Sequence, residues 1–381
     1  MSSKNTWYNL GPTKKLSQKS LQQIEIAKVK IALSYRDGEF NAISGVCNHV
    51  SGPLGEGRIE GDYIVCPWHY YKFHFKTGAG EPGFEDDRVA SYPLKIESDH
   101  LLIDLNPKTP TNKLPHDPLP LARKPERAPG PLRIAGISTT VMDSKNPRVS
   151  TSELLLEASL KHAKDKGYDT HLIKIRDLSF RHCEGFYSKN AHACIWPCSI
   201  TQIDSNDQLD QVYEDLVHWA DVIILATPIR WGSASSLYYK MAERLNCIQN
   251  QITTHNNQLI RNKVAGFIIT GGQDNVQSVA GHMMGFFSEL GFHLPPFPFI
   301  AHSLGWSMEN MAFNVRYVLR SEALVEASQG LIDRCADLAA SLVASSAPDT
   351  LTHRGGRKAF NPEKHQDVLS SAEAIAQPSD S

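Results

Sequence analysis

Two short pairs of cysteine and histidine are the residues of this 381-residue chain best suited to chemistry. Cys47 and His49 are separated by one residue, Cys66 and His69 by two, and sixteen residues lie between the pairs. Two thiolates and two imidazoles suit either zinc or an iron–sulfur centre. The pairing favours a [2Fe–2S] cluster, because one iron can take both sulfurs and the other both imidazoles.

The loops around these pairs also favour an iron–sulfur cluster. Glycine and proline are frequent in them, in Ser51-Gly52-Pro53-Leu54-Gly55 and Cys66-Pro67-Trp68-His69. Such loops bring backbone N–H groups close to sulfur. No recognition helix follows the second pair, as it would in a zinc finger. A zinc site, or four residues that fall at this spacing without a metal, are the alternatives.

The second loop carries a family resemblance. Cys66-Pro67-Trp68-His69, followed by Phe73-x-x-x-Thr77-Gly78, resembles the second cluster loop of soluble Rieske ferredoxins. The resemblance implies that Cys47 and Cys66 bind one iron and that His49 and His69 bind the other.

The sequence departs from the Rieske pattern at two places. Tyr70 stands where the family commonly has glycine. Val50 and Ser51 follow His49, so the extra cysteine pair of respiratory Rieske proteins is absent. This absence predicts a potential toward the lower end of the range of about −150 to +300 mV for such centres.

The composition changes twice along the chain. Residues 5–105 contain short apolar runs separated by Gly, Pro, Asn and Asp, which predicts an all-β domain. In residues 106–131, eight of 26 residues are proline, which excludes a helix and predicts an extended linker. Residues 346–381 are rich in Ser, Pro, Gly and charge, and we expect a disordered tail.

Residues 132–345 alternate between apolar runs and helical patterns. The expected strands are 132–137, 171–175, 221–227, 263–270 and 291–300. The expected helices are 150–167, 207–219, 232–249, 274–290 and 311–344. This order predicts an α/β domain with a five-stranded, doubly wound parallel sheet.

Three loops at the carboxyl ends of these strands could bind a phosphorylated ligand. The first contains Ser138 and Thr139, then Arg148, Ser150 and Ser152 at the start of a helix, which suits a phosphate monoester. A loop that uses Ser and Thr only as caps and turn residues is the alternative. The other two loops, 228–233 and 271–273, contain glycines that let the backbone approach a flat ring.

Together these segments resemble the NAD(P)H-dependent FMN reductase branch of the flavodoxin-like superfamily, over about residues 132–345. No G-x-G-x-x-G follows the first strand, so a dinucleotide Rossmann site is not expected there. The resemblance implies a homodimer or homotetramer with FMN near the subunit interface. It also implies the following FMN-binding residues: Ser138, Thr139, Arg148, Ser150, Ser152, Pro228, Ile229, Arg230, Trp231, Gly232, Ser233, Gly271, Gly272 and Gln273.

Three cysteines in the connection after the second strand have an open role. Cys183, Cys194 and Cys198 are separated by ten and three residues, which does not match a compact cluster motif. Zinc is conceivable because His182 and His192 lie close by. We expect loop packing instead.

The overall composition excludes several functional classes. The chain has 39 Lys and Arg residues and 41 Asp and Glu residues. It therefore lacks the excess of basic residues that would indicate nucleic-acid binding. No apolar stretch approaches the 18 or so residues of a membrane span, and the N-terminus does not resemble a signal peptide. The seven cysteines are better read as ligands or core residues than as disulfides, which predicts a reducing cytoplasm.

The two predicted cofactors lead to a functional hypothesis. A flavin accepts a hydride and releases electrons singly, whereas a [2Fe–2S] centre carries one electron. We therefore expect an oxidoreductase that passes electrons from NAD(P)H through FMN to the cluster, and then to a partner protein or small substrate. In a second hypothesis an external donor reduces the cluster and FMN reduces an organic substrate. The third is a non-enzymatic carrier or redox sensor. No residue is assigned as a general acid or base.

Overall fold

A computed structural model describes residues 6–113, 119–143, 145–271, 275–305 and 307–345. Residues Met1–Ala340 cluster as one unit by their internal contacts. The predicted disordered tail, residues 346–381, lies outside the described residues.

The N-terminal region is an all-β domain of three small antiparallel sheets, as the sequence predicts. Their strand orders are β1-β10-β9, β2-β3-β4-β8 and β5-β6-β7. The strands are β1 (Trp7–Pro12), β2 (Leu21–Ile26), β3 (Val29–Arg36), β4 (Glu39–Ser44), β5 (Arg58–Glu60), β6 (Tyr63–Val65), β7 (Lys72–His74), β8 (Ser91–Tyr92), β9 (Leu94–Glu97) and β10 (His100–Asp104), with a short helix α1 (Thr13–Leu16).

Two-residue turns set the hairpins of this domain. Ala27 and Lys28 between β2 and β3, and Asp37 and Gly38 between β3 and β4, all have positive φ. Two positive φ angles are the signature of the type I′ turn, whose twist matches that of paired strands. The two hairpins join β2, β3 and β4 in one sheet, and the loop that follows β4 carries Cys47 and His49.

Of the proline-rich segment the structure describes residues 106–113 and 119–131, and Pro120–Ala122 forms a short 3-10 helix where no helix was expected. Two of the described residues are bonded to other parts of the chain. Asn112 forms a β-bridge with Arg88 of the β domain. Further along, Leu121 is buried and its carbonyl oxygen accepts a hydrogen bond from Trp196 Nε1 at 3.2 Å.

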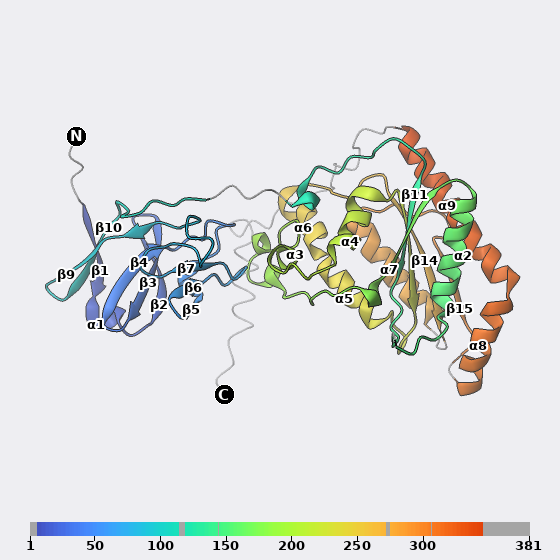
Figure 1. Cartoon of the computed structure of the whole chain (residues 1–381), viewed down its shortest axis with the longest axis horizontal. Helices are drawn as coiled ribbons and strands as arrows, with labels where there is room; N and C mark the ends of the chain where they lie inside the picture. The colour runs from blue at the N-terminus through green and yellow to red at the C-terminus, as the bar shows by residue number, and fades with distance from the viewer. Residues whose placement is uncertain (1–5, 114–118, 144, 272–274, 306, 346–381) are drawn as a thin grey trace, which may run out of the picture. The chain divides into compact units, whose positions relative to one another are not determined.

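The C-terminal region is an α/β domain with five parallel strands in the order β12-β11-β13-β14-β15 (Figure 1). This order confirms the predicted doubly wound sheet, and its switch point lies between β11 and β13. The strands are β11 (Arg133–Ser138), β12 (Asp169–Lys174), β13 (Val222–Pro228), β14 (Val264–Gly271) and β15 (Phe299–Ser303).

Helices cover both faces of this sheet. Figure 1 shows α2, α8 and α9 on one side and α4 to α7 on the other. Glycines let helices pack closely on the first side: a Cβ at Gly136 would lie 2.6 Å from Leu160 of α2, and one at Gly266 would lie 2.9 Å from Cys335 of α9. The helices are α2 (Thr151–Asp165), α3 (Ser199–Ile203), α4 (Asp210–Tyr213), α5 (Ser236–Arg244), α6 (Asn246–His255), α7 (Val276–Leu290), α8 (Met308–Arg320) and α9 (Glu322–Ser345).

Three predicted elements differ from the structure. The fifth strand is Phe299–Ser303 and not 291–300, because Pro295, Pro296 and Pro298 cannot donate to a sheet. The predicted helix 232–249 is two helices, α5 and α6, with Leu245 between them. The predicted helix 311–344 is also two, because Ser321 is extended and its hydroxyl accepts from the N–H of Leu324 at 3.3 Å.

Candidate cluster and flavin sites

The loops after β4 and β6 bring the first cysteine–histidine pair against the second. A Cβ at Gly52 would lie 2.6 Å from the sulfur of Cys66, so only glycine fits at this point of the first loop. Backbone N–H groups of the two loops point at the cysteine sulfurs, two at Cys47 and two at Cys66. This arrangement is what the glycine and proline content of the loops predicts.

Cys47 and Cys66 are 2% and 1% exposed, and their thiols hydrogen-bond to each other. The hydrogen bond from Cys47, together with the N–H groups of Trp68 and His69, lowers the pKa of Cys66 to about 7. The same pairing with Cys66, and burial, raise the pKa of Cys47. Two buried sulfurs in contact, one of them easily deprotonated, suit a thiophilic iron.

The two histidines point the same ring nitrogen at the same place. Nδ1 of His49 lies 3.1 Å from Nδ1 of His69. Two nitrogens bound to one tetrahedral ion at bond lengths of about 2.0–2.1 Å would be roughly 3.3 Å apart. His49 also stacks on Tyr71, with ring centroids 4.4 Å apart. The two imidazoles therefore stand as a pair of ligands to one iron would.

The opposite nitrogen of His69 is also bonded. Nε2 of His69 lies 2.7 Å from the carbonyl oxygen of Ala193, and the side chain is 1% exposed. A carbonyl can only accept, so Nε2 carries the proton and Nδ1 is free to bind a metal. Burial lowers the pKa of His69.

A second site is a cavity of about 510 Å³ that residues at the carboxyl ends of β11, β13 and β14 help to line. Its position is the one where doubly wound sheets bind ligands, and its volume suits a small cofactor. It is lined by Thr140, Val141, Met142, Arg148, Val149, Ser150, Thr151, Pro228, Arg230, Thr270, Gly271, Met311, Asn314 and Val315.

One end of the cavity is built for an anion. Ser150 caps the N-terminus of the 15-residue helix α2, where backbone N–H groups and the helix dipole favour negative charge. Arg148 and Arg230 both line the cavity, whereas no Asp or Glu is among its described lining residues. Burial and the nearby Arg148 lower the pKa of Arg230, as expected for two cations that face one site.

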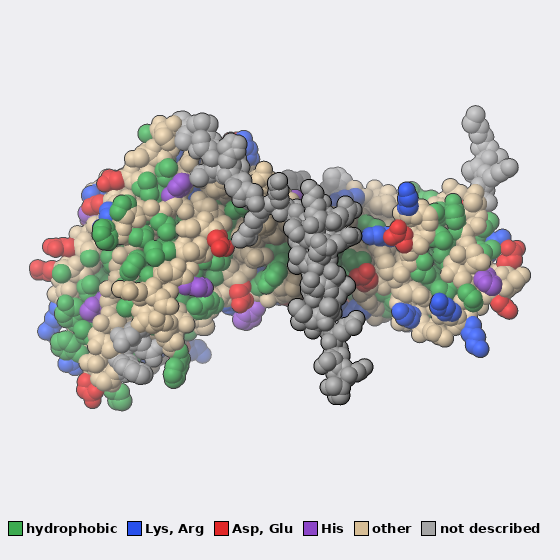
Figure 2. Space-filling model, turned by 180° about the vertical axis from the view of Figure 1, so that it is seen from behind, with side chains coloured by type: hydrophobic (Ala, Val, Ile, Leu, Met, Phe, Trp, Pro, Cys, Tyr) green, Lys and Arg blue, Asp and Glu red, His purple; other side chains and the backbone are tan. Residues whose placement is uncertain are grey.

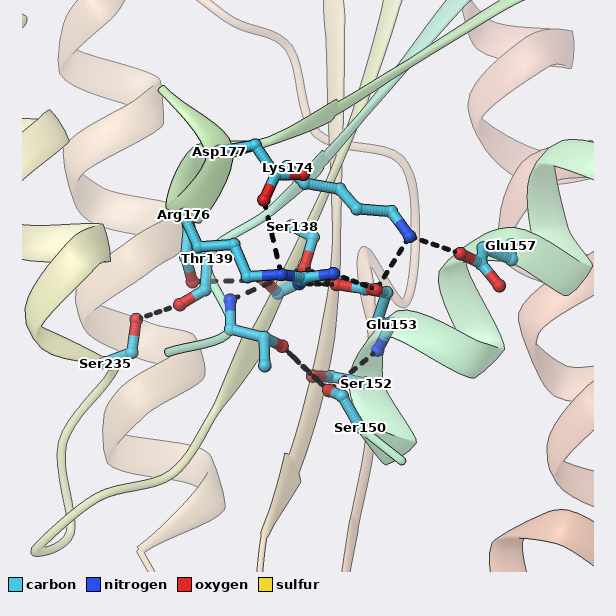
Figure 3. A network of polar contacts seen from close by, with 12 residues as sticks. Ser138, Thr139, Ser150, Ser152, Glu153, Glu157, Lys174, Arg176, Asp177 and Ser235 are labelled. Atoms are coloured by element: carbon cyan, nitrogen blue, oxygen red, sulfur yellow. Dashed lines mark hydrogen bonds and ion pairs between the residues drawn. The ribbon is translucent and has the colours of Figure 1, made fainter. Parts of the chain in front are cut away.

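A polar network below this end fixes the first loop (Figure 3). The hydroxyl of Ser138 donates to Glu153 at 2.7 Å, and Arg176 and Lys174 also bind that carboxylate. Burial alone would raise the pKa of Glu153, but these bonds lower it to about 2. Glu153 therefore does not complete a reciprocal capping box but anchors the start of α2 to β11.

The structure brings five of the predicted FMN residues to the cavity wall: Arg148, Ser150, Pro228, Arg230 and Gly271. Others lie behind or beside it. The hydroxyls of Ser138, Thr139 and Ser152 bond to protein partners, and these side chains are buried. Ile229, Trp231, Gly232 and Ser233 are not among the described lining residues. Gly272 and Gln273 lie outside the described residues.

Sequence reasoning missed the contribution of α8. Met311, Asn314 and Val315 line the cavity although α8 follows the last strand. Asn314 donates to the carbonyl of Gly271 at 3.2 Å, and its side chain also interacts with His302. Thr140 was also missed, although it extends the hydroxyl run that begins at Ser138. No local sequence pattern indicated that α8 returns to this site.

Comparisons with known proteins agree with both halves of this description. Residues 6–93 match the family described as the Rieske [2Fe-2S] domain. The ferredoxin component of the naphthalene 1,2-dioxygenase system of Pseudomonas putida is 34% identical over 77 residues, which cover 20% of this chain and 74% of that protein. The chain belongs to the Rieske [2Fe–2S] family. The ferredoxin subunit of the 3-phenylpropionate/cinnamic acid dioxygenase of Shigella flexneri is 38% identical over 76 residues, 20% of this chain and 72% of that protein.

The second half of this Rieske protein matches a different family model. Residues 136–306 match the family described as NADPH-dependent FMN reductase. Among solved structures, RosB with a bound riboflavin-phosphate derivative is 18% identical to this chain. The match covers 65% of this chain and 88% of the RosB chain, with a TM-score of 0.44. The chain therefore joins a Rieske domain to an FMN reductase domain and is an oxidoreductase that uses a [2Fe–2S] cluster, FMN and NAD(P)H.

The donor sets of the two sites fit these cofactors. Two sulfurs and two Nδ1 atoms supply the two ligands that each iron of a Rieske cluster takes. In the FMN reductase domain, the helix N-terminus and two arginines suit the phosphate, and Asn314 adds a polar side chain to the cavity wall.

The remaining cysteines of the FMN reductase domain are free thiols. Cys183, Cys194, Cys198 and Cys247 line one small pocket. The hydrogen bond from Cys247, helped by Arg244, lowers the pKa of Cys198 to about 5. The expectation that Cys183, Cys194 and Cys198 serve loop packing stays a prediction.

Proposed function

We propose that the chain takes electrons from NAD(P)H on FMN and passes them singly to its own Rieske cluster, which delivers them to an acceptor outside the chain. The observation that carries this proposal is the presence of both sites in one chain, one suited to a phosphorylated flavin and one to a [2Fe–2S] cluster. Bound FMN supplies the conversion of a two-electron donor into single electrons.

Each site residue has a defined part in the proposal. Cys47 and Cys66 bind one iron, and His49 and His69 bind the other through Nδ1. Ser150, Arg148 and Arg230 bind the FMN phosphate at the start of α2. Pro228, Gly271 and Asn314 line the part of the cavity beyond the phosphate.

The acceptor is proposed to be a partner protein or a small molecule. The similar ferredoxins are components of dioxygenase systems, which supports an oxygenase as the protein partner. On the face shown in Figure 2, the blue Lys and Arg side chains are interspersed with red Asp and Glu, which gives no support to a nucleic-acid partner. No helix among the described residues has the length and apolar character needed to cross a membrane.

A homodimer or homotetramer in the cytoplasm completes the proposal. The exposed side of α8, beside the flavin cavity, carries Met308, Phe313 and Tyr317, which are 79%, 58% and 41% exposed. Exposed apolar patches on a globular protein commonly mark protein–protein contacts. The free thiols support a reducing compartment.

An anaerobic titration tests the direction of electron flow. The purified protein is titrated with NADPH and then NADH, absorbance is recorded, and the products are examined by EPR. The proposal predicts that the flavin bands bleach and that the signal of a reduced Rieske cluster grows. If dithionite gives that signal and both nicotinamides leave the spectrum unchanged, the cluster receives its electrons from an external donor and the proposal is wrong.

A further inference from the structure

Residues 181–194 of the FMN reductase domain, here called the docking segment, form a platform anchored from behind. Asn250 of α6 donates to the carbonyl oxygens of Ala191 and Cys194, each at 2.7 Å, and is 6% exposed. At the other end, Arg244 of α5 donates to the carbonyl of Arg181 at 2.8 Å. Both anchors lie on helices, so the loop that they bind has a defined position.

This segment contacts the second cluster loop at the ligand itself. The Ala193 carbonyl accepts from Nε2 of His69, and Phe186 packs edge-on against the same ring, with centroids 5.2 Å apart at 90°. A metal-binding histidine almost always donates its other ring N–H to a carboxylate, a backbone carbonyl or water, which fixes the tautomer. Here the FMN reductase domain supplies that carbonyl to the Rieske domain.

Tyr70, which stands where the family commonly has glycine, faces the same segment. Its φ is +61°, a backbone conformation that glycine adopts most readily. Its hydroxyl donates to Glu184 at 2.9 Å, and Lys189 lies over its ring at 5.6 Å. The tyrosine thus gives the loop a polar and an aromatic contact with the docking segment, which glycine could not give.

Lys189 adds a third contact. Its Nζ donates to the carbonyl of Pro67 at 2.5 Å and lies 5.2 Å from the ring of Phe186. Three positions of one cluster loop, Pro67, His69 and Tyr70, therefore meet a single short segment of the other domain. All three contacts fall on the cluster ligand His69 or within two residues of it.

The same helices connect the docking segment with the flavin cavity. α5 begins directly after Ser235, at the end of the loop that contains Pro228 and Arg230. Its nine residues span roughly 13 Å and end at Arg244, and α6 with Asn250 follows. The flavin cavity and the docking segment therefore lie at opposite ends of one helical unit.

We propose that residues 181–194 are a built-in dock for the second cluster loop, which commits the His69 edge of the cluster to electron transfer within the chain. This inference rests on the proposed function and deepens it. With His69 buried against Ala193, an external protein cannot contact that edge as long as the dock is occupied. Tyr70, Glu184 and Lys189 are positioning residues, because they touch the dock and do not bind the cluster.

The test compares the wild-type holoprotein with a combined variant, Tyr70→Phe, Glu184→Gln and Lys189→Met. These changes remove the hydroxyl, the carboxylate and the ammonium of the dock and leave all four ligands in place. Lys76→Met is the matched control, because Lys76 pairs with Glu39 within the Rieske domain. Iron and flavin contents, which should equal those of the wild type, show that each variant is folded and loaded.

Two measurements follow. Amide hydrogen exchange reads the order of residues 68–70 and 186–193. Stopped-flow absorbance reads electron transfer from the dithionite-reduced cluster to ferricytochrome c, a one-electron protein acceptor. We expect the combined variant to exchange about tenfold faster in both segments and to reduce cytochrome c several-fold faster, whereas the control matches the wild type. The single variant Glu184→Gln should shift both readouts in the same direction by a smaller factor.

Equal exchange and equal cytochrome c rates in the wild type and the combined variant would overturn the dock. That result is distinguishable from failure of the proposed function. If nicotinamides never reduce the wild-type cluster, the proposed function fails, yet the exchange difference would still report the dock. If they reduce it and no difference is seen, the dock alone is wrong.

Discussion

Nδ1 of His49 lies 3.1 Å from Nδ1 of His69, although the two residues come from different loops. The carbonyl of Ala193 binds Nε2 of His69 and so leaves Nδ1 unprotonated. The thiols of Cys47 and Cys66 hydrogen-bond to each other. The protein thus presents two nitrogens and two sulfurs in the separate pairs that a Rieske cluster needs.

Cys66→Ser should remove the cluster and spare the flavin, because a serine oxygen is a poor replacement for a thiolate on iron. We expect less than about a tenth of the wild-type iron and acid-labile sulfide per chain, with unchanged FMN. Cys183→Ser is the control, since Cys183 lies in the FMN reductase domain and should not be a ligand. Wild-type iron content in Cys66→Ser would contradict the assignment.

Arg148→Gln and Arg230→Gln should each weaken FMN binding by roughly 10- to 100-fold, as expected for the loss of a charge-assisted hydrogen bond of about 1.5–3 kcal/mol. Riboflavin, which lacks the phosphate, should bind to wild type and variants alike. Fluorescence titration of the flavin-free protein measures both affinities. Lys161→Gln, on the exposed side of α2, is the control. An equal loss of FMN and riboflavin affinity would show that the arginines do not bind the phosphate.

Asp207→Asn should lower the free energy of unfolding by about 3–5 kcal/mol, because it leaves a buried charge unpaired. Asp207 and Arg244 form an ion pair at 2.7 Å with both side chains fully buried. Asp204→Asn is the control: Asp204 pairs with Arg181 at 4.0 Å, both side chains are partly exposed, and the loss should be below about 1 kcal/mol. Denaturant unfolding measures the free energy of unfolding of both variants. Equal losses in the two variants would refute the claim that the buried ion pair matters more than the exposed one.

The sequence predicted the chemistry of the first site more completely than that of the second. Cys47, His49, Cys66 and His69 are local pairs, so their spacing and the residues of their loops together indicated the kind of centre. The flavin cavity is assembled from β11, β13, β14 and α8, and contacts across so many elements have no local signature. Arg148 and Ser150 were found because they adjoin a helix start, whereas Asn314 was not.

The fold shows the same division. The strand order follows from alternating strands and helices, which the apolar periodicity made visible. Breaks in helices were missed where they depend on one residue, as at Ser321, whose hydroxyl caps α9. The contact of Ala193 with His69 joins residues 124 apart through a backbone atom, so no side-chain pattern could predict it.

Stability should increase with pH between about 8 and 10 because of Lys263. Burial lowers the pKa of Lys263 to about 8, against about 10.4 in the unfolded chain. Between these values the unfolded state binds the extra proton, so raising the pH favours the folded state. The free energy of unfolding of the wild type, minus that of Lys263→Met, should therefore rise from pH 7.5 to pH 10. The difference in unfolding free energy between the wild type and Lys161→Met should not change with pH. If the difference for Lys263→Met also does not change, the pKa of Lys263 is not lowered by burial.

The most direct test of the account is whether reduction of the cluster by NADPH depends on bound FMN. FMN-loaded wild-type protein is compared with the combined variant Arg148→Gln and Arg230→Gln, from which the flavin has been removed. Each is mixed anaerobically with NADPH, and the reduced cluster is quantified by EPR. The account predicts a Rieske signal in the wild type and none in the emptied variant, with recovery when FMN is added at a concentration that saturates the weakened site. Cluster reduction by NADPH without flavin, or no reduction in the FMN-loaded wild type, would contradict it.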